Sequence, residues 1–307
     1  VGVNIFGSIS QSYATGSATA EGGDWNSAGA LAGMNNGSIS QSYWNKDLAT
    51  SAVGLGSAAG ATGLTTEQMF DASHFAGFAW GTVWGNAGNQ STPYLLGMAG
   101  NQVFIKTDVP SSVSHASRPP LYTAIQDVQQ LQAIQNDLAG RYALVNHIDA
   151  SATAGWNLNA GIYNGFAPIG SSSDNTDATR FTGSFDGLGH RIRELTVNVT
   201  QPQYLGIYGR SSYAGLFGAT GSAARIAHVG LDNASIKASG GSTNSAGTLV
   251  GRNSGAIVQS YATGNTTAEG QSDSINSAGA LVGSDEGRGG NERRSRRAPD
   301  NEEGRGR

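Results

Sequence analysis

The strongest candidate for acid–base chemistry in the sequence is the run Asp186-Gly187-Leu188-Gly189-His190, which places a carboxylate four residues before an imidazole. A carboxylate and an imidazole held close together could act as a proton-transfer pair. A glycine-rich turn explains the same residues, with Asp186 accepting hydrogen bonds from backbone amides and His190 at the edge of the turn. We favour the turn.

Other candidates for catalysis or metal binding carry a weaker signal. The remaining histidines, His74, His115, His147 and His228, lack the spacing of metal ligands, and the sequence holds no His-Glu-x-x-His motif. No Gly-x-Ser-x-Gly elbow lies between a strand and a helix, as a serine hydrolase would need. The run Gly54-Leu55-Gly56 lacks the basic residue and the following helix of a phosphate site.

Acidic residues were considered because polysaccharide lyases and glycosidases on parallel β-helices need paired carboxylates or acids that hold a cation. The acids considered are Glu21, Asp24, Asp174, Asp177, Glu269 and Asp273. Asp174 and Asp177, which lie in a loop rich in Ser and Asn, could bind calcium weakly, but we favour a loop without a metal. The others occupy equivalent places in a repeat, which argues against catalysis because an active site is needed only once. We therefore expect no enzyme, and no catalytic, cofactor-binding or metal-binding residues.

The elements that would position any such residue are set by repeated phrases. The fullest copy is residues 246–264, AGTLVGRNSGAIVQSYATG, and residues 28–43 hold a close copy; partial copies lie at 7–16, 214–218 and 278–283. The phrase tyrosines Tyr13 and Tyr43 recur at nearly the same interval as the phrase leucines Leu216, Leu249 and Leu281. Self-similarity at a near-constant period of this size is typical of stacked repeats.

Composition favours an all-β chain with tight corners. The sequence has 46 glycines, 13% charged residues and no cysteine, and short runs of Ile, Val, Leu, Tyr and Thr alternate with Gly-, Ser- and Asn-rich segments. Strands this short need stacked neighbours to bury them, and parallel stacking would satisfy their backbone groups. We expect a parallel β-helix, a solenoid with short helices at module ends, in which Leu31, Leu216, Leu249 and Leu281 align in columns. No run is long and apolar enough for a membrane span.

The pattern divides the chain into five parts. Residues 1–44 hold repeats, and residues 45–100 form a module-closing segment with a capping box at Thr65 and Gln68 and a dense aromatic group that we interpret as a local core. The alternative is a platform that stacks carbohydrate. Residues 101–120 read as a linker. Residues 121–287 form a second module, beginning with a helix between Asp127 and Gly140. Residues 288–307 are a charged tail.

A family resemblance follows from residues 131–144, 148–151, 166–170 and 181–187 together with the repeats. In this order they resemble the GLUG-repeat region of filamentous-haemagglutinin-like exoproteins, large bacterial adhesins of two-partner secretion. The resemblance covers about residues 1–287. It implies a right-handed parallel β-helix, secreted or associated with the outer membrane at the cell surface. It also implies partners: host cell-surface or matrix glycans and proteins for adhesion, and an outer-membrane transporter for the full-length protein.

Two alternatives to an adhesive or structural segment stay open: a polysaccharide-active β-helix enzyme and an accessory region of a secreted protease. Because the chain begins at Val1 within repeat sequence and has no signal peptide, we expect it to be a fragment. The tail carries seven arginines and four acids, and its composition changes abruptly within a repeat, which is typical of a shifted reading frame or a disordered end. We expect no nucleic-acid partner. Glycosylation acceptor sequences begin at Asn36, Asn89, Asn198, Asn233 and Asn265.

Overall fold

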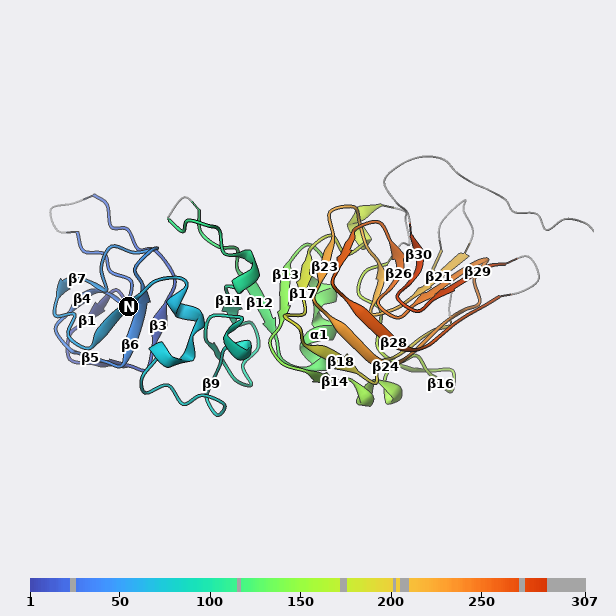
Figure 1. Ribbon diagram of the computed structural model, residues 1–307, viewed down its shortest axis with the longest axis horizontal. Helices are drawn as coiled ribbons and strands as arrows, with labels where there is room; N and C mark the ends of the chain where they lie inside the picture. The colour runs from blue at the N-terminus through green and yellow to red at the C-terminus, as the bar shows by residue number, and fades with distance from the viewer. Residues whose placement is uncertain are drawn as a thin grey trace, which may run out of the picture.

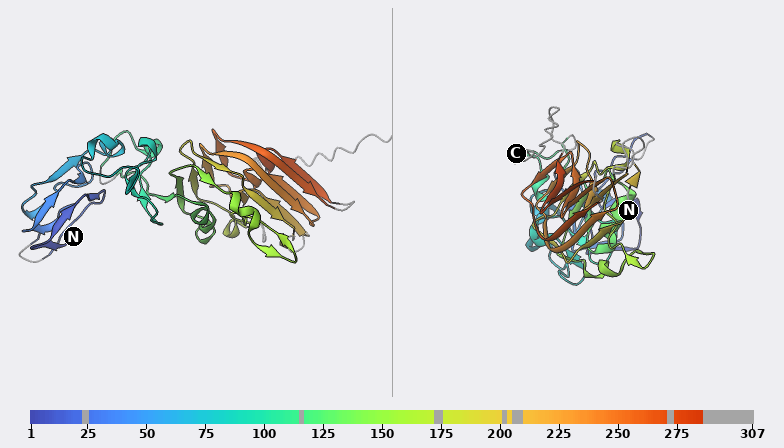
Figure 2. Two further views of the ribbon diagram at one scale, coloured as in Figure 1. Left: turned by 90° about the horizontal axis from the view of Figure 1, so that it is seen from below. Right: turned by 90° about the vertical axis from the view of Figure 1, so that its right-hand side faces the viewer.

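The computed structural model describes residues 1–22, 26–114, 117–171, 176–200, 203–204, 210–270 and 274–285. Within these ranges the chain is all-β, with short strands and one α-helix of six residues. The molecule is elongated: the strands up to Leu64 lie at one end and those of the last repeats at the other (Figures 1 and 2). In this part of the chain, no helix is long and apolar enough to cross a membrane.

The amino-terminal sheets are small and parallel. They are β1 (Val3–Asn4), β4 (Ala32–Asn35) and β7 (Val53–Gly56); β2 (Ser8–Ser10) and β5 (Ser38–Ser40); and β3 (Tyr13–Ala14), β6 (Ser42–Asn45) and β8 (Ala61–Leu64). Ile9 pairs with Ile39, and Tyr13 pairs with Tyr43. Equivalent residues of the two phrase copies therefore lie side by side, as the repeat predicts.

The carboxy-terminal sheets follow the same rule over more strands. The first sheet comprises β11 (Gln102–Val103), β12 (Tyr122–Ile125), β13 (Arg141–Leu144), β17 (Ser184–Asp186), β23 (Arg225–Ala227) and β27 (Ala256–Val258), and the second comprises β14 (Ile148–Asp149), β18 (Arg191–Arg193), β19 (Thr196–Val199), β24 (Gly230–Ser239) and β28 (Tyr261–Glu269). The third comprises β20 (Gln203–Tyr204), β21 (Arg210–Ala214), β25 (Thr243–Gly247) and β29 (Ile275–Gly279). The fourth comprises β22 (Phe217–Ala219), β26 (Val250–Asn253) and β30 (Val282–Asp285). The pairings within these sheets are parallel except β11 with β12 and β20 with β21.

The repeated leucines align within the carboxy-terminal sheets. Backbone hydrogen bonds join Phe217 N to Leu249 O and Leu249 N to Leu281 O, and the preceding alanines of the phrase pair along β21, β25 and β29. Leu31 does not join this column. It belongs to the amino-terminal sheets, where its amide donates to Ala52 O. The expected column thus holds three of the four leucines, because the first phrase copy builds a separate group of sheets.

Glycine in the phrase is required by the close approach of adjacent layers. A Cβ built on Gly247 would lie 2.2 Å from Val250 O and 2.3 Å from Gly283 N. Both atoms belong to the backbone, so neither can move aside cheaply. Because Gly247 has no side chain, its backbone can pack directly against the backbone of the adjacent strand. The phrase leucines Leu216 and Leu249 are fully buried in the largest apolar cluster.

Helical segments are few and short. Helix α1 (Val128–Ala133) begins where Asp127 Oδ1 accepts from Gln130 N at 2.7 Å, as the capping box predicts. It ends earlier than expected: the chain passes into a 3₁₀ turn at Ile134–Asn136, and Asp137 is extended, with φ of −147°. The 3₁₀ helices are Gln68–Phe70, Ala72–His74, Ala87–Asn89, Lys106–Asp108, Ile134–Asn136, Ser151–Gly155 and Asp177–Thr179. The hairpins are β9 (Trp84–Gly85) with β10 (Tyr94–Leu95) and β15 (Leu158–Asn159) with β16 (Ile162–Tyr163).

The aromatic group that follows the amino-terminal sheets is a local core. Phe75, Phe78 and Trp84 are buried, and the Phe75 and Phe78 rings pack on Tyr43, with centroids 4.8 and 5.5 Å away. Thr65 and Gln68 form the predicted reciprocal pair of hydrogen bonds, at 2.9 and 3.1 Å. The predicted linker, residues 101–120, contains strand β11. Its residues Phe104 and Ile105 are buried and pack against residues outside the linker. The domain boundaries stay predictions.

Candidate functional site

The run 186–190 forms the expected turn. Asp186 Oδ1 accepts a hydrogen bond of 2.9 Å from Leu188 N, while His190 N bonds to Gly187 O at 2.7 Å. The Asp186 carboxylate has another imidazole as its partner: His228 Nδ1 lies 3.0 Å from Asp186 Oδ2. The carboxylate and the imidazole proposed from spacing are therefore not a pair, and His228, which directly follows β23, takes that place.

The Asp186–His228 pair spans two adjacent strands. Parallel pairing aligns Asp186 at the end of β17 with Ala227 of β23, which places His228 directly after it. Asp186 is fully buried, and His228 Nε2 lies 2.7 Å from Gln259 Oε1 at the next layer. Both imidazole nitrogens are thus occupied by protein side chains. These hydrogen bonds join the ends of the consecutive paired strands β17, β23 and β27.

His190 lies beside His147 with ring centroids 5.0 Å apart. Both its ring nitrogens are buried and have no hydrogen-bond partner in the described chain. Burial, followed by repulsion from His147, lowers the pKa of His190 to about 4. The ring is therefore neutral near pH 7. His147 is exposed as a residue, but its ring is partly desolvated. This desolvation, followed by the positive charges of Arg191 and Arg193, also lowers the pKa of His147.

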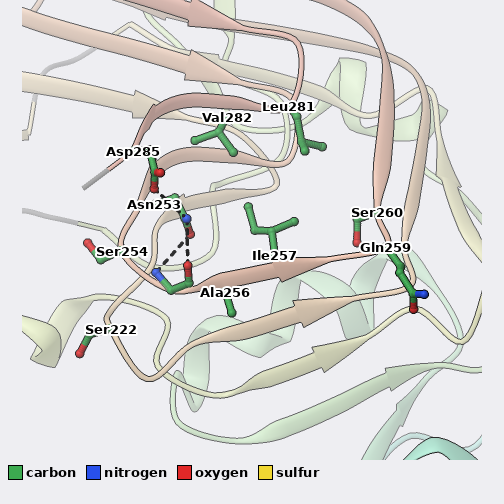
Figure 3. A pocket seen from close by; sticks show the side chains of 11 residues that line it. Ser222, Asn253, Ser254, Ala256, Ile257, Gln259, Ser260, Leu281, Val282 and Asp285 are labelled. Atoms are coloured by element: carbon green, nitrogen blue, oxygen red, sulfur yellow. Dashed lines mark hydrogen bonds between the residues drawn. The ribbon is translucent and has the colours of Figure 1, made fainter. Parts of the chain in front are cut away.

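A pocket of about 630 Å³ lies at the end of the described carboxy-terminal sheets (Figure 3). Its floor is apolar, formed by Ile257, Leu281 and Val282, and Asn253 bridges its wall by donating to Asp285 Oδ1 at 3.1 Å. Asp285 is the one ionisable side chain among the described lining residues. Ile226 and Leu249, deeper in the same sheets, are fully buried. It offers hydrogen-bonding groups and no paired acid and base.

The acids singled out from the sequence are dispersed among the described residues. Glu269 makes an ion pair of 2.8 Å with Lys237, Asp177 lies 3.9 Å from Arg180, and Glu21 is exposed. Asp24, Asp174, Asp273 and the tail 288–307 lie outside the described residues. Across the described ranges, no three acids or histidines are arranged to hold a metal ion.

The five glycosylation acceptors differ in accessibility. Asn36, Asn89, Asn233 and Asn265 are exposed. Asn198 is half-buried, and its Nδ2 donates to Tyr163 O at 3.3 Å. The side chains of Asn36, Asn233 and Asn265 are open to modification in the folded chain. Asn198 is already engaged, and so is Asn89, whose Oδ1 accepts from Asn86 Nδ2 at 2.6 Å and from Ala72 N at 3.3 Å.

The irregular chain that follows α1 exposes apolar side chains at one hairpin. The hairpin β15–β16 exposes Leu158, Ile162 and Tyr163, with between 48% and 61% of each residue accessible. The sequences of residues 151–180 and 200–213 lack the repeated phrase, so we expect recognition on these loops, where the chain is freed from strand pairing. Trp156, Asn157 and Ala167 of the first loop lie beside α1, and half of the second loop lies outside the described residues.

Comparison with known proteins gives one partial similarity. Over 115 residues the chain is 36% identical to halomucin of Haloquadratum walsbyi (strain DSM 16790 / HBSQ001), covering 36% of this chain. The chain spans about 1% of the length of that curated relative. No family model matches the chain, and no solved structure matches it. The resemblance to GLUG repeats therefore stays a prediction.

Proposed function

We propose that the chain is a structural and adhesive segment of a secreted or cell-surface protein, built as a right-handed parallel β-helix and without catalytic activity. The observation that carries this proposal is the in-register parallel pairing of equivalent phrases. Ile9 pairs with Ile39 and Ile226 with Ile257, in each case across one repeat. Layers repeated in this way give length and stiffness, because each contacts only its neighbours.

The outward face supplies many similar weak contacts. Ser235 of β24 pairs with Asn265 of β28, Lys237 pairs with Thr267, and the side chains of Ser235, Asn265 and Thr267 are exposed. Hydroxyl and amide groups at regular intervals suit a repetitive partner such as a glycan or an extended protein, since many weak bonds combine by multivalency. The similarity to part of halomucin is compatible with this place at the cell surface.

The finer parts of the proposal follow the family resemblance. We propose that the full-length protein resembles filamentous haemagglutinin, passes the outer membrane through the transporter of a two-partner system, and binds host or neighbouring-cell surfaces. The dispersal of the acids among the described residues favours this interpretation over a polysaccharide-active enzyme, which needs paired carboxylates. The accessory region of a secreted protease is the second alternative.

Adhesion is tested by binding the labelled chain to cells, matrix proteins and a glycan array. The parent chain is compared with the triple variant Ser235→Ala, Asn265→Ala and Thr267→Ala, which alters exposed side chains only. We expect binding by the parent chain and weaker binding by the variant. Absence of binding across the whole panel refutes adhesion and leaves a spacer, whereas release of reducing ends from polysaccharides refutes the absence of catalysis.

A further inference from the structure

A groove of about 450 Å³ lies between α1 with its following 3₁₀ turn and the chain around Trp156. Its volume falls in the range of about 300–1,000 Å³ that is typical of small-ligand pockets. The groove is lined by Gln129, Gln132, Ala133, Gln135, Asn136, Trp156, Asn157 and Ala167. Among these described residues none is ionisable, and five carry side-chain amides.

Part of the amide wall is held rigidly by the backbone of the facing loop. Gln132 donates to Ala167 O at 2.9 Å and accepts from Ala167 N at 2.8 Å, so its amide orientation is fixed. Gln135 donates to the same carbonyl at 2.8 Å, and Asn157 donates to Gly165 O at 2.7 Å. These bonds use the Nδ2 or Nε2 groups of Gln135 and Asn157 and leave their oxygens as acceptors at the groove.

The remaining amides supply both donors and acceptors. Gln129 and Asn136 are exposed, and their side chains make no hydrogen bond within the described chain. Each can donate two hydrogen bonds and accept others. The wall therefore combines fixed acceptors with free donors, without a net charge that would select an ion.

The indole of Trp156 completes the groove with a flat apolar surface. One of its faces is stacked on Phe166, at 6.5 Å between ring centroids and 24° between planes, and Phe166 is fully buried. The backbone is tied on both sides, because Trp156 N donates to Thr153 O and Trp156 O accepts from Gly165 N. The next residue, Asn157, has φ of 54°, an uncommon conformation that the surrounding bonds maintain. The half-buried ring is thus positioned before any ligand arrives.

We propose that this groove binds a neutral saccharide. Ring C–H groups would pack on the indole, and hydroxyls would exchange hydrogen bonds with the amides of Gln129, Gln135, Asn136 and Asn157. An uncharged, amide-rich wall beside one aromatic ring suits hydroxyl groups, which both donate and accept, better than a carboxylate or phosphate, which needs cations. The proposal rests on the proposed function only in placing the chain where such sugars occur.

The test uses the full chain and saturation-transfer NMR with neutral probes: methyl mannoside, methyl galactoside, N-acetylglucosamine oligomers and maltotriose. A galacturonate oligomer is the anionic probe. We expect saturation transfer to at least one neutral sugar and binding that is insensitive to salt, because no ion pair is formed. Loss of the stacking contact in Trp156→Ala should weaken binding about tenfold or more. Gln129→Ala and Asn136→Ala should each weaken it about three- to tenfold.

Tyr163→Ala is the matched control, since Tyr163 is an exposed aromatic of the same loop that does not line the groove. Its affinity should equal that of the parent chain. Trp156→Phe retains an aromatic ring and should bind with intermediate affinity, which separates loss of stacking from misfolding of Trp156→Ala. The proposal is overturned if no neutral probe binds, if the anionic probe binds better in a salt-dependent way, or if Trp156→Ala binds as well as Tyr163→Ala. If a neutral saccharide binds in the NMR experiment but the chain does not bind to cells, the saccharide site is supported and only the proposal of adhesion is refuted.

Discussion

Replacing His190 by phenylalanine should make the folded chain less sensitive to acid. The pKa of His190 is lowered from 6.5 to about 4, mainly by burial. The unfolded chain therefore binds a proton at His190 at a higher pH than the folded chain does. The contribution of the neutral ring to stability is complete above pH 6.5 and is lost as the pH falls through 6.5 toward 4.

The size of this effect follows from the shift and from the partial exposure of the ring. Each pKa unit corresponds to about 1.4 kcal/mol, which sets an upper bound of about 3.5 kcal/mol for the full shift. Because the ring is half-buried, solvent screening reduces the expected loss to about 1–2 kcal/mol between pH 7 and pH 4. Phenylalanine does not titrate, and it also removes two buried nitrogens that lack partners. We expect the variant to be at least as stable as the parent chain at pH 7.

The assay is urea unfolding, followed by circular dichroism, of the parent chain and His190→Phe at several pH values between 7 and 4. The expected result is a free energy of unfolding that falls more steeply with acidity for the parent chain. His190→Leu serves as a second variant without a titrating group at this position, and it should show the same shallow pH dependence as His190→Phe. Parallel pH curves for parent and His190→Phe would refute the assignment of the acid sensitivity to His190.

Three further substitutions test the layer packing by the same unfolding measurement. Gly247→Ala should lower the free energy of unfolding by about 2 kcal/mol or more because its Cβ meets backbone atoms, whereas Gly16→Ala, with no atom within 4 Å, should change it little. Equal effects would contradict the close approach. Asn35→Ala should lower the free energy of unfolding by about 2–3 kcal/mol, since the Asn35 side chain is hydrogen-bonded to Asn4 and to two backbone groups. A loss below about 0.5 kcal/mol would contradict these hydrogen bonds. Phe217→Ala should cost about 3–5 kcal/mol, and a neutral result would mean that its burial is wrong.

Local features of the fold were predictable because they depend on neighbours in sequence. The capping pairs Thr65 with Gln68 and Asp127 with Gln130 form as their spacing indicates. The turn at Asp186 was also predictable, since its carboxylate bonds the amide of the nearby Leu188. The end of α1 was not, because the helix passes into a 3₁₀ turn at Ile134, where no glycine or proline in the sequence signals a stop.

The candidate sites show the same division. The Asp186–His228 pair was missed because only the pairing of β17 with β23 brings these two residues together. The groove at Trp156 was foreseen only as a loop, since its amides come from α1 and from a later, separate segment of the chain. One signal was available for each: His228 and Gln259 occupy the same position of the repeat, and Gln129, Gln132 and Gln135 form a glutamine-rich helical face.

The sequence by itself determined the all-β character and the in-register pairing of equivalent phrases. A repeated phrase carries its glycines, apolar residues and turns at fixed offsets, so each copy presents the same backbone and apolar face to the next. Only the tertiary structure decided which copies pair, with Leu31 in one group of sheets and Leu216, Leu249 and Leu281 in another. It also decided which polar groups stay unpartnered. Those outcomes depend on how the intervening chain packs between distant segments, and no local period encodes that packing.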